Sequence, residues 1–214
     1  MDNFIVTIAR GYGTGGKEIG SKLAEAYGIQ CYERRILSLA SQLSGIEEDE
    51  FKKIDEKIRE KSWKDMLSKL PIVNTSEAKL HKFVSDDLLF EYQAKIIRTL
   101  SKTESCVIVG KCADYVLKGM PNVVSVYIEA PREYTRERIM EKHKVPKEIA
   151  DDMITKTDKY RADYYAQYTH GNYWTNPVNY DITLNSSTLG IDGCIAMIEH
   201  CLKEKVKIPY PNGK

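Results

Sequence analysis

The feature that most constrains this chain is a glycine-rich stretch that joins an apolar segment to an amphipathic one. Residues 4–9 are apolar and β-prone, residues 11–16 carry four glycines, and a helical pattern begins at Lys17. Glycines let the backbone take positive φ angles and approach a polyphosphate closely. The N–H groups that open a helix point at such an anion, with the helix dipole behind them. The sequence therefore predicts a strand, a phosphate-binding loop and a helix.

Two phosphate-binding motifs overlap in this stretch. Residues 11–17 fit the P-loop pattern G-x-x-x-x-G-K, with Glu18 in place of the Ser or Thr that normally holds Mg²⁺. Three of the glycines also fit G-x-G-x-x-G, and Glu33 follows the next predicted strand, where a dinucleotide fold has a ribose-binding acid. We favour the P-loop because Lys17 has a phosphate role there and none in a dinucleotide site. A plain turn is less favoured, because it needs one special backbone position and not four.

The P-loop interpretation assigns nucleotide binding to a continuous set of residues. They are Gly11, Gly13, Thr14, Gly15, Gly16, Lys17 and Glu18.

Composition limits the possible partners. The chain has 214 residues, 42% of them hydrophobic, which suits one core and one domain with insertions. Thirty-two basic and 31 acidic residues leave a net charge of +1, so no overall field recruits nucleic acid or anionic lipid. Five cysteines form no C-x-x-C pair, which indicates reduced thiols. With no signal-peptide pattern and no apolar run of about 18 residues, we expect a cytoplasmic protein with no membrane partner. The oligomeric state is not indicated.

Apolar strand patterns alternate with helical ones along the chain. Strands are predicted near residues 4–9, 29–32, 106–110, 123–128 and 179–184, and helices near 17–27, 33–43, 85–100, 191–202 and after Pro131 and Pro146. This alternation predicts an α/β fold with a five-stranded parallel sheet, right-handed crossovers and helices on both faces. A charged segment after Glu47 indicates a helical insertion over about residues 45–85.

Phosphoryl transfer depends on positioning and on positive charge around the moving group. Besides Lys17, such charge comes from the two helices after Pro131, which could close as a lid and exclude water. The candidates there are Arg136, Arg138, Lys156, Lys159 and Arg161. A helical cation is usually solvated, but Asp158 lies three residues before Arg161 and could orient it.

The acceptor and a metal ion call for further groups at strand ends. Arg35 and Lys111 are cations that follow predicted strands, and Glu33 and Asp114 are carboxylates in similar places. Glu18 and Asp114 are the candidate Mg²⁺ ligands, and few are needed because Mg²⁺ keeps most of its waters.

Four segments resemble the cytidylate kinase-like family of P-loop nucleoside monophosphate kinases. They are residues 7–24 (TIARGYGTGGKEIGSKLA), 107–114 (VIVGKCAD), 158–165 (DKYRADYY) and 179–186 (NYDITLNS). The resemblance implies a P-loop NTPase fold, an acceptor-binding insertion around residues 45–85 and a lid around residues 130–170. It also implies ATP as the phosphoryl donor.

The resemblance differs in strength along the chain. Gly11, Gly16 and Lys17 match the P-loop of the family, while Lys111 falls where cytidylate kinases have the arginine of a Gly-Arg-Asp element, whose aspartate is replaced by Cys112. Asp158 and Arg161 resemble the Asp-x-x-Arg of the lid region.

The expected function is ATP-dependent phosphoryl transfer to a small acceptor, with a nucleoside monophosphate such as CMP implied by the resemblance. In this interpretation the catalytic residues are Lys17, Arg136, Arg138, Asp158 and Arg161, and the acceptor-binding residues are Glu33, Arg35, Lys111 and Asp114. A catalytically silent nucleotide sensor of the same fold and a dinucleotide-binding protein remain as alternatives.

Overall fold

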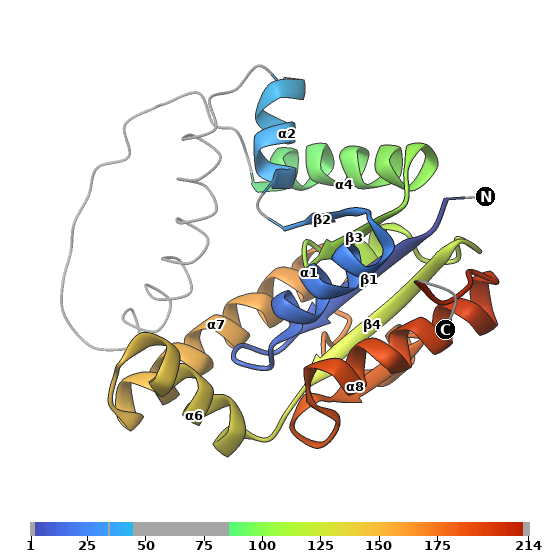
Figure 1. The fold of residues 1–214 in the computed structure, drawn as a ribbon. Helices are drawn as coiled ribbons and strands as arrows, with labels where there is room; N and C mark the ends of the chain where they lie inside the picture. The colour runs from blue at the N-terminus through green and yellow to red at the C-terminus, as the bar shows by residue number, and fades with distance from the viewer. Residues whose placement is uncertain (1–2, 34, 45–85, 212–214) are drawn as a thin grey trace, which may run out of the picture. The chain divides into compact units, whose positions relative to one another are not determined.

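The computed structural model describes residues 3–33, 35–44 and 86–211 (Figure 1). It divides into two compact units, one made of Met1–Glu33 and Ile97–Lys214 and the other of Arg34–Ile96. Helix α4 (Asp86–Thr103) runs across the boundary between them. The insertion predicted over residues 45–85 lies outside the described residues.

Five parallel strands form a single sheet in the first unit. They are β1 (Ile5–Arg10), β2 (Gln30–Tyr32), β3 (Cys106–Val109), β4 (Val123–Glu129) and β5 (Ile182–Asn185). Their order is β2-β3-β1-β4-β5, and every neighbouring pair is parallel, as predicted (Figure 1). Strand β1 is central, so the loop that follows Arg10 leaves from the middle of the carboxyl edge.

Most of the helices begin and end close to the predicted positions, but the last one begins at Ser186, before the predicted start near residue 191. Besides α4 they are α1 (Gly16–Tyr27), α2 (Arg35–Ser44), α5 (Ala113–Val116), α6 (Arg132–His143), α7 (Lys147–Tyr168) and α8 (Ser186–Cys201), with η1 (Pro177–Asn179) and η2 (Leu202–Val206) as 3₁₀ and π segments. Pro131 and Pro146 are N-caps of α6 and α7, and Gly28 ends α1 with a φ of 65°. Helices α6 and α7 occupy the predicted lid range and pack against each other (Figure 1).

The last strand differs from the prediction. It begins at Ile182 and not at Asn179, because Pro177–Asn179 form a 3₁₀ turn. The Asn176 side chain caps this turn by accepting a hydrogen bond from the Val178 N–H. Proline favours such a turn because its φ angle is fixed.

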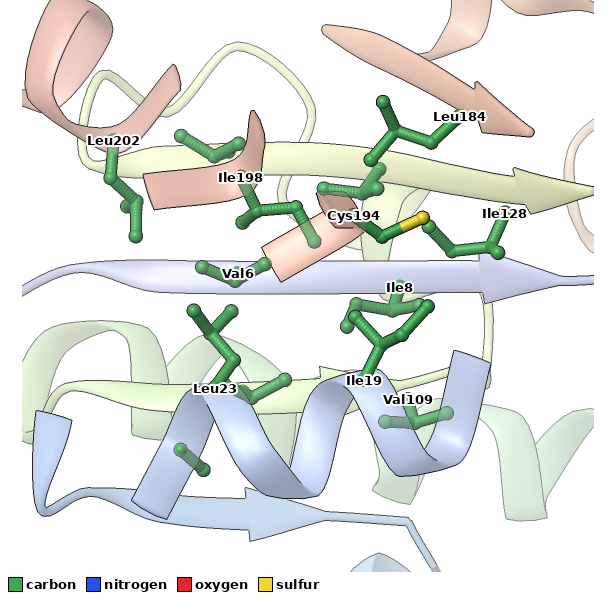
Figure 2. Packing of buried hydrophobic residues seen from close by; sticks show 14 of the residues in the cluster. Val6, Ile8, Ile19, Leu23, Val109, Ile128, Leu184, Cys194, Ile198 and Leu202 are labelled. Atoms are coloured by element: carbon green, nitrogen blue, oxygen red, sulfur yellow. The ribbon is translucent and has the colours of Figure 1, made fainter. Parts of the chain in front are cut away.

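Buried side chains cover both faces of the central strand β1. Ile5, Val6 and Ile8 of β1 are all at most 1% exposed, as expected for a parallel sheet between two helical layers. On one face, Leu23 of α1 and Ile198 of α8 pack against alternate β1 side chains (Figure 2). Each fully buried aliphatic side chain of this kind stabilises the fold by roughly 1.5–3 kcal/mol.

On the opposite face of the sheet, aromatic side chains close the core. The ring of Tyr127 on β4 stacks on Tyr180 at 5.2 Å and meets Trp174 edge-on at 5.5 Å.

Among the described helices, none has the length and apolar character needed to cross a membrane.

Candidate functional site

The loop between β1 and α1 takes a backbone conformation that its glycines permit. Gly13 and Gly15 have φ angles of 88° and 84°, in the left-handed region. A Cβ atom on Gly13 would lie 2.8 Å from the Thr135 carbonyl oxygen of α6. The Thr14 hydroxyl donates to the Gly11 carbonyl at 2.9 Å, which closes the loop on itself. The loop therefore leads into α1 as a compact turn whose first helical N–H groups lie at the carboxyl edge of the sheet.

Lys17 and Glu33 form an ion pair beside this loop. Lys17 Nζ lies 2.7 Å from Glu33 Oε2, and Arg10 Nη2 lies 3.4 Å from the other oxygen of the same carboxylate. Glu33 immediately follows β2, and Arg10 is the last residue of β1. The structure thus brings the predicted Lys17 and Glu33 together and adds an arginine that sequence reasoning did not single out.

Helix α7 holds the first turn of the loop. Asp158 Oδ1 accepts a hydrogen bond of 2.7 Å from the backbone N–H of Tyr12, and Arg161 Nη1 donates one of 2.9 Å to the Arg10 carbonyl. The Arg161 guanidinium also lies over the Tyr12 ring, 5.7 Å from its centre. Burial lowers the pKa of Arg161 to about 10, with the charge of Arg10 acting in the same direction. Burial also raises the pKa of Asp158, and the Arg161 charge opposes that rise. Asp158 and Arg161 therefore anchor α7 to the loop.

Arg138 of α6 lies at the start of α1. Its Nη2 atom is 3.2 Å from Glu18 Oε2, and a Cβ on Gly15 would lie 3.4 Å from the same nitrogen. Glu18 also pairs with Lys22 at 3.8 Å. Arg138 thus lies beside the loop, and the carboxylate of Glu18 is shared by two cations. The catalytic role expected of Arg138 stays a prediction.

Arg136 has a different environment on α6. Its Nη1 atom pairs with Asp151 Oδ2 of α7 at 3.3 Å, and Arg132 Nε donates to the other oxygen of that carboxylate at 2.8 Å. The hydrogen bond from Arg132 lowers the pKa of Asp151, and that from Arg136 adds to the effect. These contacts join α6 to α7. The catalytic role expected of Arg136 stays a prediction.

The remaining lid cations pair along their own helix. Lys156 lies against Asp152, and Lys159 Nζ lies 2.8 Å from Asp163 Oδ2, both at i,i+4 spacing on α7. Such pairs are typical of a solvated helix face.

Asp114, in the first turn of α5, is buried. Its side chain is 7% exposed, and Asp114 Oδ2 accepts a hydrogen bond of 2.8 Å from the Tyr165 hydroxyl of α7. Burial raises the pKa of Asp114 to about 6, against the hydrogen bond from Tyr165. Tyr165 is thus the hydrogen-bond partner of Asp114, and the acceptor-binding and metal-binding roles expected of Asp114 stay predictions.

Lys111 lies in a strained turn after β3. Lys111 and Cys112 have φ angles of 60° and 53°, although neither is glycine. Arg35 is the first residue of α2 and belongs to the other unit, so its acceptor-binding role stays a prediction, as does that of Lys111.

The strand order separates the two phosphate-binding interpretations. In the dinucleotide fold the strand order is 3-2-1-4-5-6, with the first strand beside the second. Here β1 lies between β3 and β4, and β2 is at the edge of the sheet. The order of the described strands therefore differs from that of the dinucleotide fold, and Glu33 forms ion pairs with Lys17 and Arg10.

Comparison with known families agrees with this topology. Residues 5–188 match the model of the cytidylate kinase-like family. The chain belongs to this family. Its fold is that of a P-loop kinase, an α/β fold with a five-stranded parallel sheet.

Solved structures resemble this cytidylate kinase-like protein over almost its whole length. An uncharacterized protein from Eubacterium ventriosum ATCC 27560 shares 25% identity over 94% of this chain and 99% of its own, with a TM-score of 0.67. Shikimate kinase from Bacteroides thetaiotaomicron shares 12% identity over 94% and 98% of the two chains, with a TM-score of 0.51. A search of curated proteins finds no significant match.

Three residues of the site were not predicted from the sequence of this cytidylate kinase-like protein. Arg10 had a detectable signal, since it is a charged residue at the end of an apolar strand, directly before the first glycine. Tyr12 and Asp151 had none, because their roles depend on which face of α7 meets the loop and α6.

Proposed function

We propose that this protein transfers the terminal phosphoryl group of ATP to a small acceptor. The observation that carries the proposal is the glycine loop with Lys17 at its end, held by Asp158 and Arg161 of α7. The family resemblance makes a nucleoside monophosphate, CMP in particular, the first acceptor to test.

The residues around the loop suit electrostatic catalysis. The N–H groups at the start of α1 would face the donor phosphates, and Lys17 would neutralise charge on the transferred group. Arg138 is close enough to Gly15 to add a second cation on the lid side. Because preorganised charges cost no reorganisation during the reaction, such groups supply much of the rate enhancement. Closure of α6 and α7 would exclude water that otherwise hydrolyses the donor.

Residues for Mg²⁺ are less well defined. Glu18 is paired with Arg138 and Lys22, and Asp114 is buried against Tyr165. Among the residues that the structure describes, no group of three His, Cys, Asp or Glu side chains is gathered around a metal-sized space. We infer that Mg²⁺ would be held mainly by phosphate oxygens and water, with the protein supplying few ligands.

The test is an ATP-consumption screen with Mg²⁺ across nucleoside monophosphates, nucleosides and small organic acids. We expect turnover with at least one acceptor of these classes. ATP binding without turnover for every acceptor would contradict phosphoryl transfer.

One observation favours a second candidate, a nucleotide sensor. Glu18 replaces the hydroxyl that normally holds Mg²⁺ and is ion-paired with Arg138. A sensor predicts ATP binding that needs no Mg²⁺ and is unchanged when Arg138 is replaced by alanine. Calorimetry with and without Mg²⁺ separates the two functions.

A further inference from the structure

The carboxylate of Glu33 is shared between an exposed lysine and a largely buried arginine. Lys17 Nζ lies 2.7 Å from Oε2, and Arg10 Nη2 lies 3.4 Å from Oε1. The Lys17 side chain is 63% exposed, whereas that of Arg10 is 16% exposed. A lysine has a flexible four-carbon stem, so Lys17 can turn from one anion to another.

Arg10 is held in place from several sides. Its guanidinium packs against Gly110 at the end of β3, where a Cβ atom would collide with Nη1. Its side-chain stem lies under Gly16, and its carbonyl oxygen accepts the hydrogen bond from Arg161. Burial lowers the pKa of Arg10, and the charge of Glu33 opposes that change. Arg10 therefore has little freedom to follow a ligand.

When ATP binds, its phosphates and the Glu33 carboxylate would compete for Lys17. Lys17 is the loop cation that phosphate would attract, and its present partner is the Glu33 carboxylate. If Lys17 turns to the phosphates, Glu33 keeps its negative charge a short distance from the incoming polyanion. Two like charges at such a distance destabilise each other unless a cation neutralises one of them.

We propose that Arg10 is a positioning residue that retains and neutralises Glu33 when Lys17 leaves it for the phosphates. Arg10 acts through Glu33 and Lys17 and does not contact the nucleotide. This inference rests on the proposed function, since it takes Lys17 to be a phosphate ligand.

The test is a double-mutant cycle on nucleotide binding, measured by calorimetry with Mg²⁺–ATP on the full chain. Glu33→Gln releases Lys17, so we expect ATP to bind more tightly, by about threefold or more. Arg10→Gln removes one cation from Glu33, so the carboxylate should hold Lys17 more strongly, and we expect ATP binding to weaken by about threefold or more. In the double variant the loss caused by Arg10→Gln should disappear, and the affinity should equal that of Glu33→Gln.

Two further variants serve as controls for charge, for packing and for the loss of an unrelated ion pair. Arg10→Lys keeps a cation in the buried site and should bind ATP more tightly than Arg10→Gln, which separates charge from packing if the glutamine variant folds poorly. Lys205→Gln is the matched control, because it breaks an ion pair of 2.6 Å with Asp181 outside this cluster. It should leave ATP affinity unchanged.

Each outcome decides the inference. An equal loss from Arg10→Gln in the presence and absence of Glu33 means that Arg10 contacts the nucleotide or only supports the loop, and overturns it. Unchanged affinity in Glu33→Gln also overturns it, whether or not the Arg10 variants fold. Either result leaves the proposed function standing, whereas failure of the wild-type chain to bind ATP overturns both.

Discussion

Replacing Asp114 with asparagine tests whether its buried carboxylate stabilises the fold or serves the site. The side chain is 7% exposed and accepts a hydrogen bond of 2.8 Å from Tyr165. A protonated aspartate and an asparagine have the same shape and no charge, and both offer an oxygen to the Tyr165 hydroxyl. The two proteins should therefore differ only where Asp114 is ionised.

The size and sign of the effect follow from the pKa. Burial raises the pKa of Asp114 from its ordinary 3.8 to about 6, so the folded protein binds this proton more tightly than the unfolded chain. The free energy of unfolding then falls as pH rises between these two values and is lowest above pH 6. A rise of about two units corresponds to ~3 kcal/mol. At pH 8, Asp114→Asn should be more stable than the wild type by up to that amount, and the difference should shrink towards zero as the pH falls to 4 and below.

Urea denaturation of both proteins at several pH values between 4 and 8 measures this difference. Other titrating groups are common to both chains, so they cancel in the subtraction. Asp163→Asn on the exposed face of α7 is the matched control and should show no such pH-dependent gain. An Asp114→Asn protein that is less stable than the wild type at pH 8 would refute the reasoning. A stable variant that loses turnover at least tenfold would instead support the acceptor-binding role predicted for Asp114.

Three other changes probe the loop directly. Lys17→Ala should lower kcat much more than ATP affinity, because its charge matters most in the transition state, and wild-type turnover in a folded variant would contradict the P-loop assignment. Asp158→Ala removes the acceptor of the Tyr12 N–H, so hydrogen exchange in the loop should become faster, and unchanged exchange would mean that α7 does not hold it. Gly13→Ala places a Cβ 2.8 Å from the Thr135 carbonyl at a φ of 88°, so thermal unfolding should show a loss of about 1–3 kcal/mol. A melting temperature equal to the wild type would show that α6 can move away without cost.

Much of the fold could be predicted because its signals are local. The apolar run of β1, the four glycines and the cap at Gly28 specify a strand, a loop and a helix from neighbouring residues alone. The prolines at 131 and 146 marked the starts of two helices for the same reason. The start of β5 was placed too early, because the competing 3₁₀ turn at Pro177 depends on a side-chain cap.

The predicted site was only partly assembled by sequence reasoning. Lys17 was predicted from the P-loop motif, Arg138 and Arg161 from the lid helices, and Asp158 from its spacing to Arg161. The structure brings all four to the loop. Arg136 was chosen on the same grounds, yet it pairs with Asp151, because its position on α6 faces α7. A sequence pattern indicates on which face of a helix a cation lies. It does not indicate which residues that face contacts in the folded protein.

By itself, the sequence determined the order of the elements, the parallel sheet and the glycine-rich loop, since each depends on apolar periodicity and on local backbone freedom. Only the tertiary structure decided which charges meet. Tyr12 and Asp158 are 146 positions apart, Asp114 and Tyr165 are 51 apart, and Arg10 and Glu33 are 23 apart. These pairs form because parallel crossovers bring strand ends and helix faces to one edge of the sheet, where burial makes an unpaired charge costly.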